Sequence, residues 1–564
     1  MNTLEESWVN KKTQYFLILL TIIISFLFRY PTSSHIQGSD AHFYVFLADS
    51  INLFGQARWT IHPVSYFGQY PFSANAGYPL LLSSFSQMAG VPLELSTIIM
   101  TLLIALVGII GMFLFLREMF PSSGTAILGA ALFSLMPLPL FFSSGTITTR
   151  AFVIYIAPVF LFFLTRNLGV KSTRELLLAL SSLLLMFLFH KTAYFFVPIL
   201  LIYFISNRIY KLKWIAPEIL RKYRIWWVSS LFIISLLAGI FLGDAFNSPK
   251  KEGFLEGSSP IITLINAAIS LGGSANIVII FGVTGVFYLL QKEVAEKKEI
   301  FITISIIAML PTLQLWLYAR PVVSTFLIII GIYGLYWLRL KTNRKRFVSI
   351  ALSIMIISIA YAGLMMMHWG NNPLGNDGWL YSSEGAGGLS ASDFTVAVYS
   401  KSMLTSSSSF ISNYWADARL FQSYAEAPSL PDQSGMDVAN YLIYGHLSPQ
   451  EIKANVEPIS PTNVHEYIRQ EGPYSAPELT AYYRNEIKNI LYKPVDGYIS
   501  VRTMENYNTS FILVNKNFPT EHRDRWSPNP RASEFFRSTT TENYRIFETE
   551  RYSAYYPFSY IQRG

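Results

Sequence analysis

Long apolar runs separated by short polar loops fill the first two thirds of the chain. A helix that crosses a bilayer needs about 20 mostly apolar residues, because the hydrocarbon core is roughly 30 Å thick. On that basis we predict about eleven membrane helices. They lie near 14–30, 95–116, 124–142, 151–166, 175–190, 193–207, 226–243, 275–291, 299–318, 321–338 and 347–367.

Basic residues concentrate in every second loop, which is typical of loops on the cytoplasmic side of a membrane. We therefore predict a cytoplasmic N-terminus and, after an odd number of spans, an extracytoplasmic C-terminal region in an integral plasma-membrane protein. The residues behind this prediction are Lys11, Lys12, Arg166, Lys171, Arg174, Arg208, Lys211, Lys213, Arg221, Lys222, Arg224, Lys292, Lys297, Lys298, Arg339, Lys341, Arg344, Lys345 and Arg346.

The character of the sequence changes near residue 370, where turn-forming residues follow the last apolar run. We predict a transmembrane domain over 1–370, with a long first outer loop at 31–94, and a soluble domain over 371–564. The soluble domain is expected to be mixed α/β. Helices are predicted within 392–424 (which also holds a strand), at 448–453 and at 476–491, and strands at 498–501, 510–514, 545–548 and 552–556, the last two as a hairpin.

The composition supports a membrane protein and argues against nucleic-acid binding and cysteine-dependent chemistry. Hydrophobic residues make up 52% of the chain and charged residues only 14%, whereas soluble proteins average about 25% charged residues. The net charge of +8 is accounted for by the loops, so no nucleic-acid partner is expected. The absence of cysteine excludes disulfides, thiolate metal sites and a cysteine nucleophile.

The first outer loop contains the most distinctive chemistry, in the stretch Gly38–Tyr44. Asp40 is either a helix cap or a catalytic base at the edge of the hydrocarbon, and His42 is a surface residue or a second proton acceptor. Together they are also a partial site for a divalent cation such as Mg²⁺ or Mn²⁺, with no third ligand identified. An enzyme without a metal is equally compatible. The spacing over 40–54 predicts an amphipathic helix along the membrane surface.

Cations occur at the predicted outer ends of several spans, where the distribution of charge in membrane proteins disfavours them. Each could simply extend its charge to the interface. Together they favour a site for a lipid-linked phosphate, which arginine and lysine bind well. The candidates are Arg29, Arg150, Lys191 with the adjacent His190, and Arg320; Glu252 and Glu256 in another outer loop are additional acid or base candidates.

These motifs resemble those of the GT-C superfamily, the polyprenyl-phosphate-sugar-dependent membrane glycosyltransferases that include oligosaccharyltransferase catalytic subunits and protein mannosyltransferases. Gly38–Tyr44 resembles the family's first acidic motif, Tyr70-Pro71 and Gly77–Pro79 resemble the later part of that loop, and Arg320 resembles the arginine near the donor phosphate. The chain departs from oligosaccharyltransferases at Thr148–Arg150, where they have a second acidic motif. Asn413–Asp417 resembles their acceptor motif only weakly.

The resemblance implies an integral-membrane glycosyltransferase that acts at the outer membrane face. It would move a hexosyl or pentosyl group from a polyprenyl (dolichyl-type) phosphate to an acceptor hydroxyl on a glycan or protein. Such reactions occur in protein glycosylation and in cell-envelope synthesis. One alternative is transfer of a lipid-linked oligosaccharide, as by an oligosaccharyltransferase or an O-antigen polymerase or ligase. Another is a flippase or transporter of lipid-linked sugars, but that class places ionisable residues near the bilayer midplane, and charges within these apolar runs are scarce.

Overall fold

The structure is a computed structural model in which the chain forms two compact units, each described here by itself. The first comprises Met1–Thr32 and Ile98–Glu384, and the second Ser33–Thr97 and Gly385–Gly564. The described residues are 10–30, 36, 39–55, 77–143, 148–211, 278, 280–291, 296–309, 320–368, 391–402, 409–412, 421, 423–425, 446–447, 509–515, 527–528, 545–548 and 552–555.

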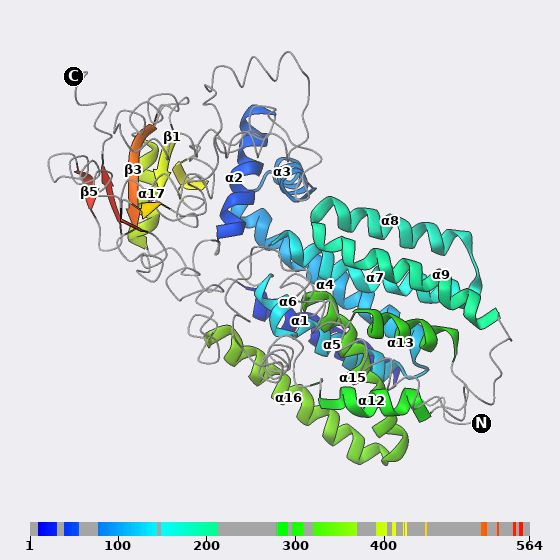
Figure 1. The fold of residues 1–564 in the computed structure, drawn as a ribbon. Coiled ribbons are helices and arrows are strands. Elements are labelled where there is room, and N and C mark those ends of the chain that lie inside the picture. Colours follow the sequence, from blue (N-terminus) through cyan, green and yellow to red (C-terminus); the bar gives the residue numbers. More distant parts are fainter. Residues whose placement is uncertain are drawn as a thin grey trace. The chain divides into compact units, whose positions relative to one another are not determined.

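The first unit is a bundle of helices (Figure 1). The helices are α1 (Lys11–Arg29), α4 (Leu93–Met119), α5 (Ser123–Ser134), α6 (Pro137–Phe141), α7 (Thr149–Val170), α8 (Thr173–Phe189), the 3-10 helix η2 (Lys191–Phe196), α9 (Val197–Lys211), α12 (Ile280–Gln291), α13 (Lys297–Met309), α15 (Arg320–Lys341) and α16 (Arg344–His368). The boundary between the units falls within α4, after Thr97.

Four of these helices are long and apolar enough to cross a membrane: α1, α4, α7 and the Arg344–Gly363 part of α16. Leucines along α8, including Leu177, Leu184 and Leu188, remain exposed, as expected of a surface that faces lipid. The chain is therefore an integral membrane protein. Nine of the predicted spans overlap helices of the described residues, the span at 124–142 falls on two helices, and the span at 226–243 lies outside the described residues.

The prediction of one continuous helix over 124–142 is wrong. Helix α5 ends at Ser134, and α6 begins at Pro137. Proline has no N–H to donate inside a helix but suits the first position of a new one. Pro137 therefore ends one apolar segment and begins another, which a count of hydrophobic residues does not reveal.

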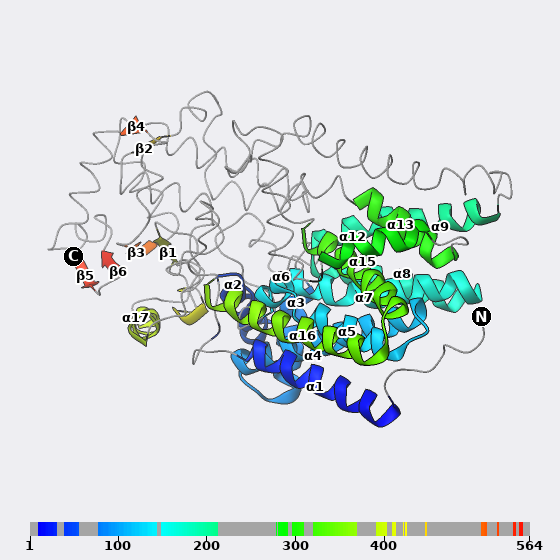
Figure 2. The same ribbon diagram turned by 90° about the horizontal axis from the view of Figure 1, so that it is seen from below.

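Glycines allow the helices of the first unit to approach closely. A Cβ atom built on Gly108 of α4 would lie 2.3 Å from the Tyr155 ring of α7. On Gly285 of α12 and Gly334 of α15 it would lie 2.0 Å from a backbone oxygen of the other helix. Helices α12 and α15 lie side by side in both views (Figures 1 and 2). Small residues at such contacts are typical of membrane helices, where packing drives association.

The second unit contains α2 (Ser39–Phe54), α3 (Gly77–Ala89) and the first turn of α4 together with the C-terminal elements. The C-terminal elements are α17 (Ala391–Lys401), β1 (Ser409–Ser412), β2 (His446–Leu447), β3 (Thr509–Asn515), β4 (Ser527–Pro528), β5 (Arg545–Glu548) and β6 (Tyr552–Tyr555). One sheet has the order β1-β3-β6-β5, with β1 parallel to β3 and the other pairs antiparallel.

Several predicted C-terminal elements are confirmed. The strand at 510–514 is β3, and the hairpin of 545–548 and 552–556 is the antiparallel pair β5 and β6. The predicted elements at 448–453, 476–491 and 498–501 lie outside the described residues. A complete α/β domain over 371–564, and the boundary near 370, remain predictions.

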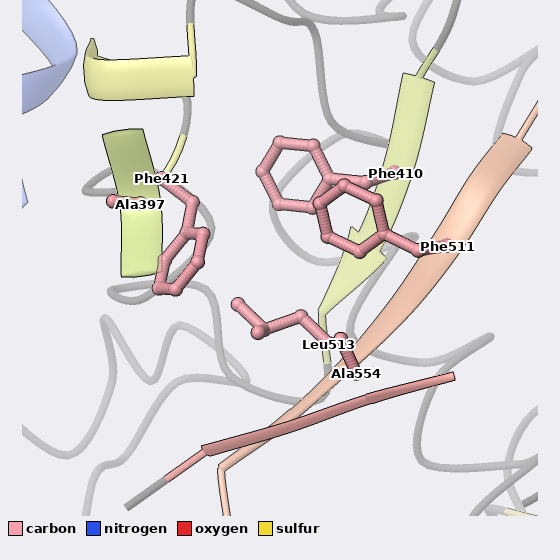
Figure 3. Packing of buried hydrophobic residues seen from close by; sticks show 6 residues of the cluster. All are labelled: Ala397, Phe410, Phe421, Phe511, Leu513 and Ala554. Carbon is pink, nitrogen blue, oxygen red and sulfur yellow. The ribbon is translucent and has the colours of Figure 1, made fainter. Parts of the chain in front are cut away.

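A small aromatic core lies between this sheet and α17 (Figure 3). Phe410 of β1 and Phe511 of β3 are partners in the parallel register, and their rings stack with centroids 5.2 Å apart. Phe421 packs on the same cluster, which also contains Ala397, Leu513 and Ala554. The helical residue Phe421 thereby packs against the sheet.

Helix α2 differs from the predicted amphipathic surface helix. Its residues 41–48 are all buried, with side chains at most 7% exposed, and α3 packs against it. The prediction was wrong because the spacing of Phe43, Tyr44, Phe46 and Leu47 was interpreted as one apolar face, whereas His42 and Ala48 are covered as well.

Candidate functional site

The C-terminal end of α1 contains a buried arginine, Arg29, which is 1% exposed. Its guanidinium donates to the Ser143 hydroxyl at 3.1 Å, the Ser25 carbonyl at 2.9 Å and hydroxyl at 2.6 Å, the Ser134 carbonyl at 3.1 Å, and the Tyr155 hydroxyl. These five contacts match the five N–H donors of a guanidinium. Arg29 therefore joins α1, α5, the turn after α6, and α7.

The turn after α6, Phe142–Ser143, lies between two arginines. Ser143 accepts from Arg29, while the guanidinium of Arg150, in the first turn of α7, lies 5.4 Å from the centroid of the Phe142 ring. Arg150 is only partly buried. We call this end of the bundle, where α1 and α5 end and α7 begins, the Arg29 end.

His190 and Lys191 belong to the same end. Helix α8 packs against α7 and follows it after a two-residue turn, so it returns to the Arg29 end before η2 starts. Buried His190 holds the start of η2, because its Nδ1 accepts the N–H of Thr192 at 3.1 Å. In the neutral ring the proton is then on Nε2. The side chain of Lys191 lies outside the described part.

Arg320 also lies at the Arg29 end, because α15 begins there and runs toward the opposite end of the bundle. Tyr333, further along α15, packs edge-on against Phe120, which lies between α4 and α5 at the opposite end of the bundle. Tyr333 comes 13 positions after Arg320, which corresponds to about 20 Å of helix. The Arg320 side chain is not among the described ones. Four predicted cation positions thus share one end of the first unit.

In the second unit, Asp40 and His42 differ in their surroundings. Asp40 is in the first turn of α2 and is partly exposed. His42 is 2% exposed, and its ring meets that of Tyr424 edge-on with centroids 5.4 Å apart. The Asp40 side chain is therefore accessible from outside the unit, whereas the His42 ring packs against Tyr424.

The helical geometry of α2 bears on the metal hypothesis. Side chains two positions apart on a helix do not face each other, so Asp40 and His42 are poorly placed to share a cation. Among the described residues, no group of three or more His, Asp or Glu gathers at one place. Glu252 and Glu256 lie outside the described residues.

Four residues that sequence reasoning missed join these sites. Ser143 and Tyr155 bind Arg29, and Glu94 accepts the hydroxyl of Tyr424 at 2.5 Å. Ser143 had a signal, because it begins the polar stretch that ends at Arg150. Tyr424 and Glu94 had none, since 330 positions separate them.

Comparison of the sequence with known protein families and with curated proteins finds no match. Comparison of the structure does find similar folds. The oligosaccharyltransferase of Archaeoglobus fulgidus, solved with a tethered acceptor peptide, gives a TM-score of 0.56 at 12% identity, over 94% of this chain and 72% of that chain.

Two further structures are similar. AglB from Archaeoglobus fulgidus, in complex with an inhibitory peptide and a dolichol-phosphate, gives a TM-score of 0.52 at 12% identity, over 90% of this chain and 69% of that chain. ArnT from Cupriavidus metallidurans gives 0.51 at 11% identity, over 98% of this chain and 99% of that chain. The chain therefore has the fold of the GT-C glycosyltransferases.

Replacing Arg29 by methionine should destabilise the protein strongly. The substitution removes all five donors and leaves buried carbonyls of Ser25 and Ser134 without this partner, at about 1–3 kcal/mol for each buried group left unsatisfied. Arg29→Lys, with three donors, should recover part of the loss. The midpoint of thermal unfolding in detergent measures both variants.

The matched control is Arg117→Met, because Arg117 is exposed and donates to the Pro121 carbonyl at the opposite end of the bundle. A surface change of this kind is expected to alter stability by only about 0.5 kcal/mol. If Arg29→Met and Arg117→Met unfold at the same temperature, the Arg29 contacts do not hold the helix ends together.

Proposed function

We propose that the chain is a membrane glycosyltransferase that moves a sugar from a polyprenyl-phosphate donor to an acceptor hydroxyl, with Asp40 as the general base. One observation carries the proposal: Asp40 is partly exposed in the first turn of a helix whose next eight residues are buried. A carboxylate held by a rigid helix and open on one side suits proton transfer to a substrate.

The fold supports the class of reaction. The chain shares its fold with the Archaeoglobus fulgidus oligosaccharyltransferase and with ArnT. AglB, a further oligosaccharyltransferase structure, was solved with a dolichol-phosphate. The cations at the Arg29 end support a phosphate-binding role for Arg150, with Lys191, Arg320 and the Nε2–H of His190 as further donors. Arg29 is left out of this set, because its five donors already have partners within the bundle.

The proposed step is a single displacement. The Asp40 carboxylate takes the proton of the acceptor hydroxyl as its oxygen forms a bond to the anomeric carbon. The bond from that carbon to the phosphate oxygen breaks, and its electron pair leaves with the polyprenyl phosphate. Arg150 and the neighbouring cations stabilise the charge on the departing phosphate. A direct displacement inverts the anomeric carbon.

The proposal favours transfer of a single sugar at the outer membrane face. Thr148–Arg150 replaces the second acidic motif that the family resemblance associates with oligosaccharide transfer. The basic residues support an Arg29 end that faces away from the cytoplasm, because Lys11 begins α1 and Arg339, Lys341 and Arg344 lie where α15 ends and α16 begins.

Asp40→Asn should lower kcat by about 10²–10⁴-fold, the usual contribution of a general base. The donor KM should change little, because the amide keeps the size of the side chain. The measurement is release of polyprenyl phosphate from a panel of radiolabelled polyprenyl-phosphate hexoses and pentoses, with purified protein in lipid nanodiscs and a membrane glycan extract as acceptor.

Asp49→Asn is the control, since Asp49 is a second partly buried carboxylate on α2. This variant should keep most of the activity. Transfer by Asp40→Asn at the rate of the Asp49→Asn control would remove Asp40 from the reaction.

Arg150→Gln should weaken binding of undecaprenyl phosphate at least about tenfold, because a charge-assisted hydrogen bond to the phosphate is lost. Binding is measured by native mass spectrometry. Undecaprenol, which lacks the phosphate, should bind both proteins equally, and Arg117→Gln should match the wild type. Equal loss for the phosphate and the alcohol would contradict a phosphate contact at Arg150.

A further inference from the structure

Tyr424 connects three segments of the second unit that are far apart in the sequence. Its hydroxyl donates to a carboxylate oxygen of Glu94 at 2.5 Å. Its ring lies edge-on to His42 of α2, with centroids 5.4 Å apart, and edge-on to Phe394 of α17, with centroids 5.0 Å apart. One side chain thus contacts the start of α4, the start of α2 and the C-terminal helix.

The position of Tyr424 is fixed by the C-terminal core. Phe421 and Ala425, on either side of it, are 0% and 2% exposed. Phe421 belongs to the cluster of Phe410 and Phe511 (Figure 3), and Tyr424 itself packs against that cluster. The sheet therefore holds the tyrosine ring in place, and the ring in turn limits where His42 can lie.

The state of the phenol suits a structural contact. Burial, followed by the neighbouring Glu94 carboxylate, raises the pKa of Tyr424 above its ordinary value. A tyrosine with a raised pKa keeps its proton at neutral and mildly alkaline pH, so the hydroxyl remains a donor to Glu94 there.

Helix α2 transmits this restraint to Asp40. His42 is two residues after Asp40 in the same first turns, and residues 41–48 are buried. The Asp40 carboxylate is consequently attached to a turn whose buried side is held by the C-terminal region. If His42 moves, the direction of the first turn changes, and a misplacement of about 1 Å in a reacting group costs as much as 10²-fold in rate.

We propose that Tyr424, held by Glu94, is a positioning residue that fixes His42 and the first turn of α2, so that Asp40 faces the acceptor hydroxyl. The catalytic part of this inference rests on the proposed function. It gives the C-terminal region a role in the reaction: it orients a base that is located in the first loop.

The first test does not depend on activity. Hydrogen exchange of the peptide covering residues 41–48 is measured by mass spectrometry for the full chain in nanodiscs. Tyr424→Phe, which keeps the ring and loses the hydroxyl, should speed exchange about fivefold, the effect of losing one ordinary hydrogen bond on a local opening equilibrium. Tyr424→Leu, which removes the aromatic ring as well, should speed exchange further. A peptide covering 153–160 of α7 is the control and should not change.

The second test measures sugar transfer with the donor from the polyprenyl-phosphate panel that the wild type uses. Tyr424→Phe should lower kcat several-fold with an unchanged donor KM, and Glu94→Gln, whose amide oxygen still accepts, should be milder. In an Asp40→Asn background, Tyr424→Phe should cause no further loss, because residues that act as one unit are non-additive.

The outcomes separate the two proposals. Unchanged exchange in 41–48 for both Tyr424 variants overturns the positioning role, whatever the activity. Faster exchange with unaltered kcat also overturns it, because the contact is then only structural. Full transfer by Asp40→Asn overturns the proposed function instead, while the exchange data still decide whether Tyr424 holds α2.

Discussion

A charged guanidinium inside a helical bundle is the interaction on which the first unit depends. Transfer of an isolated ion out of water is costly, and a buried charge persists only when its hydrogen bonds are satisfied. Arg29 meets this requirement with three hydroxyls and two carbonyls from three helices and a turn. Its partners Ser143 and Tyr155 then determine where the first turn of α7 and Arg150 lie.

Close packing extends this constraint through the bundle. Gly108 has no side chain, so α4 can pack directly against the ring of Tyr155. The hydroxyl of the same tyrosine accepts a hydrogen bond from Arg29. The short turn between α7 and α8 then returns the chain to the Arg29 end, and α15 begins there as well. Helices that alternate in direction thus bring cations from distant positions in the sequence to one end of the first unit.

Much of the fold could be predicted from the sequence, because apolar length and alternating basic loops are local signals. The α5–α6 break was missed because Pro137 lies in an apolar run. The burial of α2 was missed because the residues that cover it belong to other elements, α3 and the distant segment around Tyr424. Arg29 was grouped with the phosphate-binding candidates, since its position at a span end says nothing about the five acceptors around it. The pairing of Tyr424 with Glu94 leaves no trace in the sequence, because a single contact over 330 positions has no periodicity.

The central claim is that the Asp40 carboxylate takes the proton of the acceptor hydroxyl. Asp40→Ala removes this carboxylate, and sodium formate supplies a small carboxylate in its place. The measurement is the rate of sugar transfer by Asp40→Ala with and without formate. The account predicts that transfer is nearly abolished without formate and partly restored with it, because a general base must accept that proton. Transfer by Asp40→Ala at the wild-type rate without formate would contradict it.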